Sequence, residues 1–290
     1  MGVVGGDRDR SSAAGIQNET QFWTHVDVVF TLSGTTDNGL TFGASVDLDE
    51  AGDAIDGNDG MDGVAIFMSG NFGTVTMGDT DGGFDWGMAE VPTGSGSIDD
   101  SETFHAGYNG NGGLDGTFDG QILRYDHSVG GLGFAVSIEL DDTGTAGNSD
   151  VIGLGLRYSV ANINLGLGYQ TATTNAGAQD WDQMGLSIGT TIADIALGLN
   201  YSVLSNSTWA NDQTHVGIGA SYSMDAITIG VNYGQYSDVG GTAGNDASGW
   251  GLSAGYDLGG GASIVFGYGN SDPVTGPDID SWSIGVSMGF

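Results

Sequence analysis

The amino-acid sequence predicts an all-β protein of antiparallel strands, and three observations lead to that class. Apolar and polar residues alternate with a period of two, the chain holds 56 Gly with 3 Pro and no Cys, and no apolar run approaches the ~18 residues of a membrane-spanning helix. Successive strand side chains point to opposite faces, so this alternation gives each strand one apolar and one polar face. The glycine content and the regular pattern do not suit a helical domain, and no collagen period occurs.

The final segment, residues 281–290, alternates without a break. One face carries Trp282, Ile284, Val286, Met288 and Phe290, and the other carries only Ser and Gly. A last strand that ends on an aromatic residue is a habit of bacterial outer-membrane β-barrels. Only helices and closed barrels satisfy every backbone polar group in lipid, so a chain that spans a bilayer with such strands must form a barrel.

Sixteen segments repeat this alternation. They lie near residues 1–5, 22–33, 39–48, 63–69, 73–79, 120–128, 132–141, 150–160, 162–171, 182–191, 194–204, 213–224, 226–237, 248–258, 261–270 and 279–290. We therefore predict a single domain over residues 1–290, a 16-stranded antiparallel transmembrane β-barrel wide enough to hold an aqueous channel. Residues 1–6 lack the basic and apolar regions of a signal peptide, so we expect a mature or truncated chain.

Tyrosines mark both ends of the apolar stripes. Those beside short turns are Tyr158, Tyr222 and Tyr256, and those toward the longer loops are Tyr169, Tyr201, Tyr233 and Tyr268. The period of two alone does not separate a barrel in lipid from a soluble sandwich, whose apolar residues face inward. Two aromatic bands favour the barrel, because Tyr is stable where apolar and aqueous regions meet.

The charge is strongly acidic. The chain has 37 Asp and Glu against 4 Arg and Lys, a net charge of −33. Nucleic-acid binding is excluded in practice, because it depends on Lys and Arg that neutralise phosphates. Cations are the expected partners of such a chain. Some of the acidic residues are also explained simply as solvated surface residues.

One connection between predicted strands is much longer than the other turns and loops. The stretch from Thr80 to Asp119 contains many carboxylates together with Phe84, Trp86 and Phe104. Loops of this length are uncommon and usually functional. Folded into the barrel, this loop would narrow the channel and line the constriction with acidic side chains.

Several segments resemble the alphaproteobacterial (Rhodobacter-type) general diffusion porins. They are residues 30–45 (FTLSGTTDNGLTFGAS), 67–79 (FMSGNFGTVTMGD) and 255–265 (GYDLGGGASIV), with the terminal Phe290. The resemblance implies a homotrimer in the outer membrane of a Gram-negative bacterium, in contact with lipid and lipopolysaccharide. It also implies passive diffusion of small hydrophilic solutes, with the loop after Asp79 as the inward-folded third loop.

The departures from that family concern charge. Its barrel wall facing the third loop carries Arg and Lys, whereas the corresponding segments here carry acids and a His. The candidate residues that line the pore and its constriction are His25, Asp27, Asp47, Asp49, Asp81, Asp85, Glu90, Asp99, Asp100, Glu102, Arg124 and Arg157. Because rings of carboxylates concentrate cations, we predict a cation-selective channel.

A weak metal signal lies in the acidic run of residues 47–63. Its carboxylates at Asp53, Asp56, Asp59 and Asp62 alternate with Gly and resemble a loop for a hard cation such as Ca²⁺. The run lacks the EF-hand spacing and its terminal Glu. We predict that no cofactor is required, with Ca²⁺ as the one candidate, and solvated turn residues as the alternative reading.

Three other functions share some of these sequence features. A substrate-specific channel, for example for sugars, would use aromatic residues of the third loop, with Trp86 and Phe104 as candidates. A soluble calcium-binding adhesin or surface-layer protein shares the acidic, Gly-rich composition, but its usual nonapeptide repeat is missing. Catalysis has little support, because no G-x-S-x-G or H-E-x-x-H motif occurs and His25 beside Asp27 is the one suggestive pair.

Overall fold

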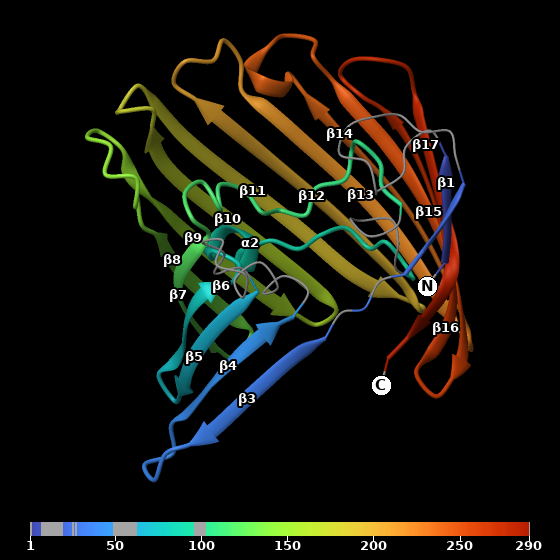
Figure 1. Cartoon of the computed structure of the whole chain (residues 1–290), viewed down its shortest axis with the longest axis horizontal. Helices are drawn as coiled ribbons and strands as arrows, with labels where there is room; N and C mark the ends of the chain where they lie inside the picture. Colours follow the sequence, from blue (N-terminus) through green and yellow to red (C-terminus); the bar gives the residue numbers. More distant parts are fainter. Residues whose placement is uncertain are drawn as a thin grey trace.

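The computed structural model consists of one continuous antiparallel sheet (Figure 1). It describes residues 2–6, 20–24, 26, 28–48, 63–95 and 103–289. The strands of the first half are β1 (Gly2–Gly6), β2 (Gln21–Trp23), β3 (Val29–Thr35), β4 (Thr41–Asp47), β5 (Val64–Gly70), β6 (Gly73–Asp79), β7 (Gln121–Val129) and β8 (Leu132–Glu139). Those of the second half are β9 (Ser149–Val160), β10 (Ile163–Thr174), β11 (Gln179–Ile192), β12 (Ile195–Asn206), β13 (Gln213–Met224), β14 (Ile227–Ser237), β15 (Ala247–Gly259), β16 (Ala262–Asp272) and β17 (Ile279–Met288).

The strands pair in chain order. From β3 to β17, each strand is antiparallel to the next. The sheet curls round, as Figure 1 shows. Strand β17 pairs with β1, with Val3 opposite Ile284, and β1 pairs with β2, with Val3 opposite Phe22. These pairs bring the two ends of the chain together.

Short turns connect the long strands of the second half. The β13–β14 turn has Asp225 at φ 52°, and the β11–β12 turn has Asp194 at φ 66°. Two-residue hairpin turns match the twist of the flanking strands when their residues take positive φ, and Asp tolerates that region better than most residues. The predicted hairpins are therefore present, with boundaries shifted by one or two residues at most strands.

The sheet has its apolar face outside and its polar face inside. On β10, Leu165 and Leu167 are exposed, whereas Gln170 is fully buried. The same inversion recurs on other strands, where Ile218, Val231 and many other large apolar side chains are exposed, while inward Ser and Asn are buried. A soluble sandwich would show the opposite arrangement. Within the part of the chain that the structure describes, no helical segment has the length and apolar character needed to cross a membrane.

Candidate functional site

The connection between β6 and β7 lies along the inner face of the sheet. Its outgoing limb (residues 80–95) begins beside β8 and contains the short helix α2 (Gly83–Gly87), and its return limb (residues 103–120) leads back to β7. Figure 1 shows both limbs crossing the inside of the curved sheet. The sequence predicted a loop folded inward over residues 80–119, but its short helix was not expected.

The outgoing limb is hydrogen-bonded through serine hydroxyls to the inner face of the sheet, which is called the wall below. Its backbone N–H groups donate to inward-facing Ser residues of three strands: Gly83 to Ser137 on β8 (2.7 Å), Ala89 to Ser187 on β11 (2.9 Å) and Ser95 to Ser253 on β15 (3.2 Å). Ser253 in turn donates to the Thr93 carbonyl at 2.5 Å. A loop with little regular secondary structure needs such partners for its backbone, and here the strands supply them.

The return limb is held in the same way at its far end. Ala106 N–H donates to Ser271 Oγ on β16 at 2.9 Å, and Ser281 Oγ on β17 donates to the Phe104 carbonyl at 3.0 Å. The loop therefore contacts strands from β8 to β17, which is most of the inner circumference that the structure describes.

Glu139 fixes the base of the return limb. Its carboxylate is 2% exposed and accepts backbone N–H bonds from Gly116 (3.1 Å), Phe118 (3.0 Å) and Gly120 (2.8 Å). Charge-assisted bonds of this kind are stronger than neutral ones. One buried carboxylate thus satisfies three backbone donors where the loop rejoins the sheet.

Two histidines join the return limb to the middle of the wall. His105 Nε2 contacts Asn232 Oδ1 at 3.0 Å, while its Nδ1 accepts from the Gly107 N–H at 3.2 Å. Because the Asn oxygen accepts, His105 carries its proton on Nε2. Burial lowers the pKa of His105 to about 4, so this ring is neutral at pH 7. On β13, His215 Nε2 donates to the Gly107 carbonyl at 2.9 Å.

Inward-facing glycines of the strands allow the loop backbone to lie directly against the sheet. A Cβ placed on Gly234 of β14 would stand 1.8 Å from the Gly107 carbonyl oxygen, and one on Gly155 of β9 would stand 2.0 Å from that of Gly83. Similar approaches occur beneath other parts of both limbs. Any larger residue at these positions would force the loop away from the wall, so part of the glycine content has a direct steric reason.

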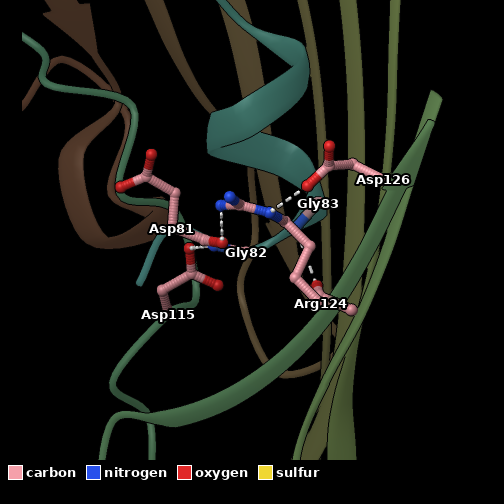
Figure 2. Close-up of polar contacts among 7 residues, drawn as sticks. Asp81, Gly82, Gly83, Asp115, Arg124 and Asp126 are labelled. Atoms are coloured by element: carbon pink, nitrogen blue, oxygen red, sulfur yellow. Dashed lines mark hydrogen bonds and ion pairs between the residues drawn. The ribbon is translucent and has the colours of Figure 1, made fainter. Parts of the chain in front are cut away.

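Charged groups gather where the outgoing limb leaves the sheet. Arg124 on β7 donates to the backbone carbonyl of Asp81 at 2.6 Å and pairs with Asp126 at 3.2 Å, as Figure 2 shows. Asp115 of the return limb accepts from the Gly82 N–H at 2.8 Å, which ties the two limbs together. Asp81 and Asp115 of this cluster lie close enough to Asp85 of α2 for their charges to act on its carboxyl group.

Two acids of this region have raised pKa values. Burial, reinforced by the charges of Asp81, Asp115 and Glu90, raises the pKa of Asp85 to about 7. Burial also raises the pKa of Asp115 to about 6, although its hydrogen bonds from Gly82 and Gln170 oppose the shift. Both carboxylates therefore change charge between weakly acidic and neutral pH.

The two predicted inward-facing arginines are engaged with the loop. The guanidinium of Arg157 on β9 stacks over the Trp86 ring at 4.6 Å from its centroid, a cation–π contact. Arg124 is bonded to Asp81 and Asp126. Their positive charge is thus surrounded by carboxylates and an aromatic ring rather than set against the loop from the opposite wall.

The aromatic candidates for a solute surface lie apart. Trp86 sits near β8 and β9, with its ring close to Gly133, whereas Phe104 contacts β16 and β17. They occupy opposite ends of the loop and do not form one contact surface.

The remaining predicted site residues fall into two groups. Glu90 is exposed and accepts from the Tyr108 hydroxyl, and Asp47 is half-buried at the end of β4. Outside the described residues lie His25, Asp27, Asp49, Asp99, Asp100 and Glu102, and with them the calcium candidates Asp53, Asp56, Asp59 and Asp62. Within the described ranges, no group of three His, Asp or Glu side chains is arranged to hold a metal ion.

Sequence reasoning missed the residues that position the loop. Glu139 follows Ser137 by two positions on the polar face of its strand, which could have identified it as an inward-facing carboxylate. The Ser and Gly residues could not be told apart from ordinary lumen-lining positions, because their partners come from a loop far away in the sequence.

An outward apolar face, an inward polar face and a loop inside the curved sheet define a membrane β-barrel channel. The family of Gram-negative porins matches residues 1–289, and the chain belongs to that family. It is therefore a protein of the bacterial outer membrane, and the family indicates a channel rather than an enzyme. This membership also removes the soluble adhesin as an alternative.

Known proteins agree with this assignment. The chain is 32% identical over 158 residues to a porin of Rhodobacter capsulatus, an alignment that covers 49% of this chain and about half (47%) of that protein. A porin structure refined at 1.8 Å is similar with a TM-score of 0.74 and 24% identity, covering 99% of this chain and 98% of the other. A mutant of the Rh. blastica porin is similar with a TM-score of 0.59 and 18% identity, covering 100% and 98%. The resemblance to alphaproteobacterial porins is thereby confirmed.

Proposed function

We propose that the chain forms a closed barrel of sixteen strands, in which β2 and β3 are parts of a single strand. This count is supported by the pairing of β1 with both β17 and β2, together with the pairing of β3 with β4. The interior of such a barrel is wide enough for water.

The function that follows is passive diffusion of small hydrophilic solutes through that interior. The observation that carries it is the inverted sheet, with apolar side chains such as Leu167 and Ile218 exposed outside and polar ones such as Gln170 buried inside. The loop narrows the passage from within, so it sets the size limit. A sugar-specific channel based on Trp86 and Phe104 is less favoured, because the two rings lie at opposite ends of the loop.

We further propose that the channel prefers cations. The net charge is −33, and both arginines of the described inner face are compensated by neighbouring carboxylates or covered by Trp86. A passage lined with carboxylates raises the local cation concentration, and the effect weakens as salt screens it.

The test is conductance of the purified protein in a planar bilayer under a KCl gradient, at low and high salt. We expect a reversal potential that favours cations and weakens at high salt. Asp81→Asn should reduce the preference about twofold, since a unit charge ~8 Å from the ion contributes roughly 0.5 kcal/mol in water. The matched control Asp194→Asn removes the same charge from the β11–β12 turn, at φ 66° that Asn tolerates, and should leave the preference unchanged. An anion-favouring potential would contradict the charge assignment, and no conductance would contradict the channel.

A homotrimer is proposed from the resemblance to the porin family. The first strands are short, and their outward residues Phe30, Leu32 and Phe42 are exposed. This face is a candidate subunit contact, with the rest of the band facing lipid and lipopolysaccharide. The test is a mass measurement of the protein in detergent, with and without the substitution Phe42→Arg. The variant should dissociate into monomers. A variant that stays trimeric would show that the subunit contact lies on another face.

A further inference from the structure

Two imidazole rings hold the return limb to the middle of the wall at Gly107. His105 of the same limb accepts the Gly107 N–H at its Nδ1 over 3.2 Å, and His215 of β13 donates from its Nε2 to the Gly107 carbonyl at 2.9 Å. Both backbone groups of Gly107 therefore depend on a histidine, and the three residues together form a histidine clasp.

Each ring of the histidine clasp presents an unprotonated nitrogen to a donor. The backbone N–H of Gly107 can only donate, so His105 Nδ1, its acceptor, carries no proton. Asn109 Oδ1 accepts from the Asn111 N–H at 2.9 Å, which leaves its Nδ2 to face His215 Nδ1 at 3.3 Å. His215 Nδ1 is thus also an acceptor. A proton added to either ring would set two N–H groups against each other.

The close fit of the limb on the wall makes such a loss costly. A Cβ placed on Gly107 would stand 1.9 Å from the Gly234 carbonyl oxygen of β14, so the limb lies directly on that strand. His105 and His215 are each 3% exposed. A charged ring would lose its hydration here, and the broken hydrogen bond would leave a buried donor unpaired. Protonation and close contact of the limb with the wall therefore oppose each other.

The titratable neighbours of the two rings are two tyrosines and one carboxylate among the described residues. On β14, the Tyr236 ring lies 4.4 Å from that of His215, and its hydroxyl donates to the Tyr108 carbonyl. Tyr108 meets the His105 ring edge-on at 6.2 Å and donates its own hydroxyl to Glu90 of the outgoing limb. A charge on His215 would act unfavourably on a charged His105. Other strand residues against the rings carry no titratable group: Gly217, Asn232, Gly234 and Gly249.

The direction of the pH effect follows from the burial of His105. Burial lowers its pKa from the usual 6.5 to about 4, whereas a ring opened to water would regain the usual value. The released limb therefore binds more protons than the bound limb between these two pH values, and a falling pH favours release. Through His105 alone, the ratio of released to bound limb should rise about a hundredfold from pH 7 to pH 4.

We propose that the histidine clasp is an acid-sensitive switch, which releases residues 107–111 from the wall into the lumen and so lowers the conductance. The segment can move by itself, because neutral side chains hold the limb on either side of it: Ser271 accepts the Ala106 N–H at 2.9 Å, and Gln170 accepts the Leu114 N–H at 2.7 Å. The effect on conductance rests on the channel function proposed above, whereas the release of the segment does not.

The experiment measures amide hydrogen exchange of the full-length protein in detergent by mass spectrometry at pH 7 and pH 4. Rates are corrected for the intrinsic pH dependence of exchange. We expect the protection of the Gly107 amide to fall about a hundredfold at pH 4. Single-channel conductance in a planar bilayer should fall over the same range.

A double variant, His105→Asn with His215→Gln, removes both titrating rings and keeps their hydrogen-bonding groups. An Asn at position 105 can accept the Gly107 N–H across two residues, as Asn109 does from Asn111 at 2.9 Å. A Gln at position 215 keeps an N–H for the Gly107 carbonyl. This variant should stay protected at both pH values. The matched control His127→Asn changes a histidine that lies against Phe134 on the neighbouring strand, and it should behave like the unaltered protein.

Comparison of the variants at the same pH cancels the contribution of carboxylates such as Asp85. An equal loss of protection in the double variant would overturn the proposal and assign the acid effect to the carboxylates. Unchanged protection in the unaltered protein would also overturn it. Should the double variant fail to assemble, as judged by its heat-modifiable mobility in gel electrophoresis, the two single variants take its place, and each should lose less protection than the unaltered protein. Absence of conductance at every pH would contradict the channel, while the exchange data would still decide on the clasp.

Discussion

The strands that lie under the loop differ from the first strands of the sheet in two ways. They are longer, and their inner faces carry buried polar side chains. Strands β3 to β6 have 7 residues each, whereas β9 to β17 have between 10 and 14. Among the described residues, every buried polar strand side chain lies on β8 to β17, beneath the loop. Several of them, such as Ser137, Gln170 and Glu139, accept hydrogen bonds from N–H groups of the loop backbone, and this need explains why Ser, Gln and Glu are buried here.

This comparison also explains where glycine is indispensable. Under the loop, Gly155 and Gly234 leave no room for a Cβ, whereas Gly189 on β11 would bring one only to 3.8 Å from the Leu197 carbonyl. Beneath the loop, inward-facing glycines therefore make room for the loop backbone, whereas the atoms that crowd Gly43 on β4 belong to Leu32 and Phe67 of the neighbouring strands. Three predictions test this division, from the largest expected effect to the smallest.

Removing the carboxylate of Glu139 should have the largest effect. Glu139→Ala leaves three backbone N–H groups without their acceptor, at up to about 1–3 kcal/mol for each group that stays buried and unpaired. We expect much faster amide hydrogen exchange at Gly116, Phe118 and Gly120, measured by mass spectrometry. Glu139→Gln keeps an acceptor oxygen, so its exchange rates at these amides should lie between those of the unaltered protein and those of Glu139→Ala. Unchanged protection in the Ala variant would mean that the return limb is held by its other contacts.

Adding one methyl group beneath the loop should have the second-largest effect. Gly234→Ala places a Cβ against the Gly107 carbonyl, and overpacking of this kind costs about 1–3 kcal/mol. The loop should move into the lumen and lower the single-channel conductance. Gly189→Ala is the matched control, because its Cβ has space. Equal conductance in both variants would refute the steric explanation.

A change of pH should have the smallest effect. Folding raises the pKa of Asp85 to about 7 and that of Asp115 to about 6, so both lose protons as the pH rises from about 5 to 8. Cation preference should increase across that range. Because the folded state binds more protons than the unfolded state there, the stability contribution of these acids falls as pH rises. Reversal potentials measured against pH check the first effect, and Asp85→Asn should flatten the curve. A flat curve in the unaltered protein would mean that these carboxylates do not face the ions.

Much of the fold was predictable because the period of two is a local property. The alternation of Leu165 and Leu167 with Gly166 and Gly168 assigns each side chain to a face without knowledge of its neighbours. The strand bounds and the hairpins follow from it. The exception is the segment predicted at 22–33, which the structure describes as β2 and β3 with an interruption between them.

The site was predictable only in outline. The length and acidity of residues 80–119 indicated an inward loop, and the sequence placed Arg124 and Arg157 on inner faces. It did not indicate that Arg124 would bind the Asp81 carbonyl or that Arg157 would stack on Trp86. These contacts join segments that are far apart along the chain, and no local pattern records them.

The sequence by itself therefore determined the class of this protein: an antiparallel membrane barrel with an acidic interior loop. Periodicity and charge are properties of single residues and their near neighbours, so they can be read without coordinates. Only the tertiary structure decided which Ser, Gly and Glu residues hold the loop, and which loop groups Arg124 and Arg157 contact. Those features arise when a loop from one part of the chain lies on strands from another, and only the folded arrangement specifies such pairs.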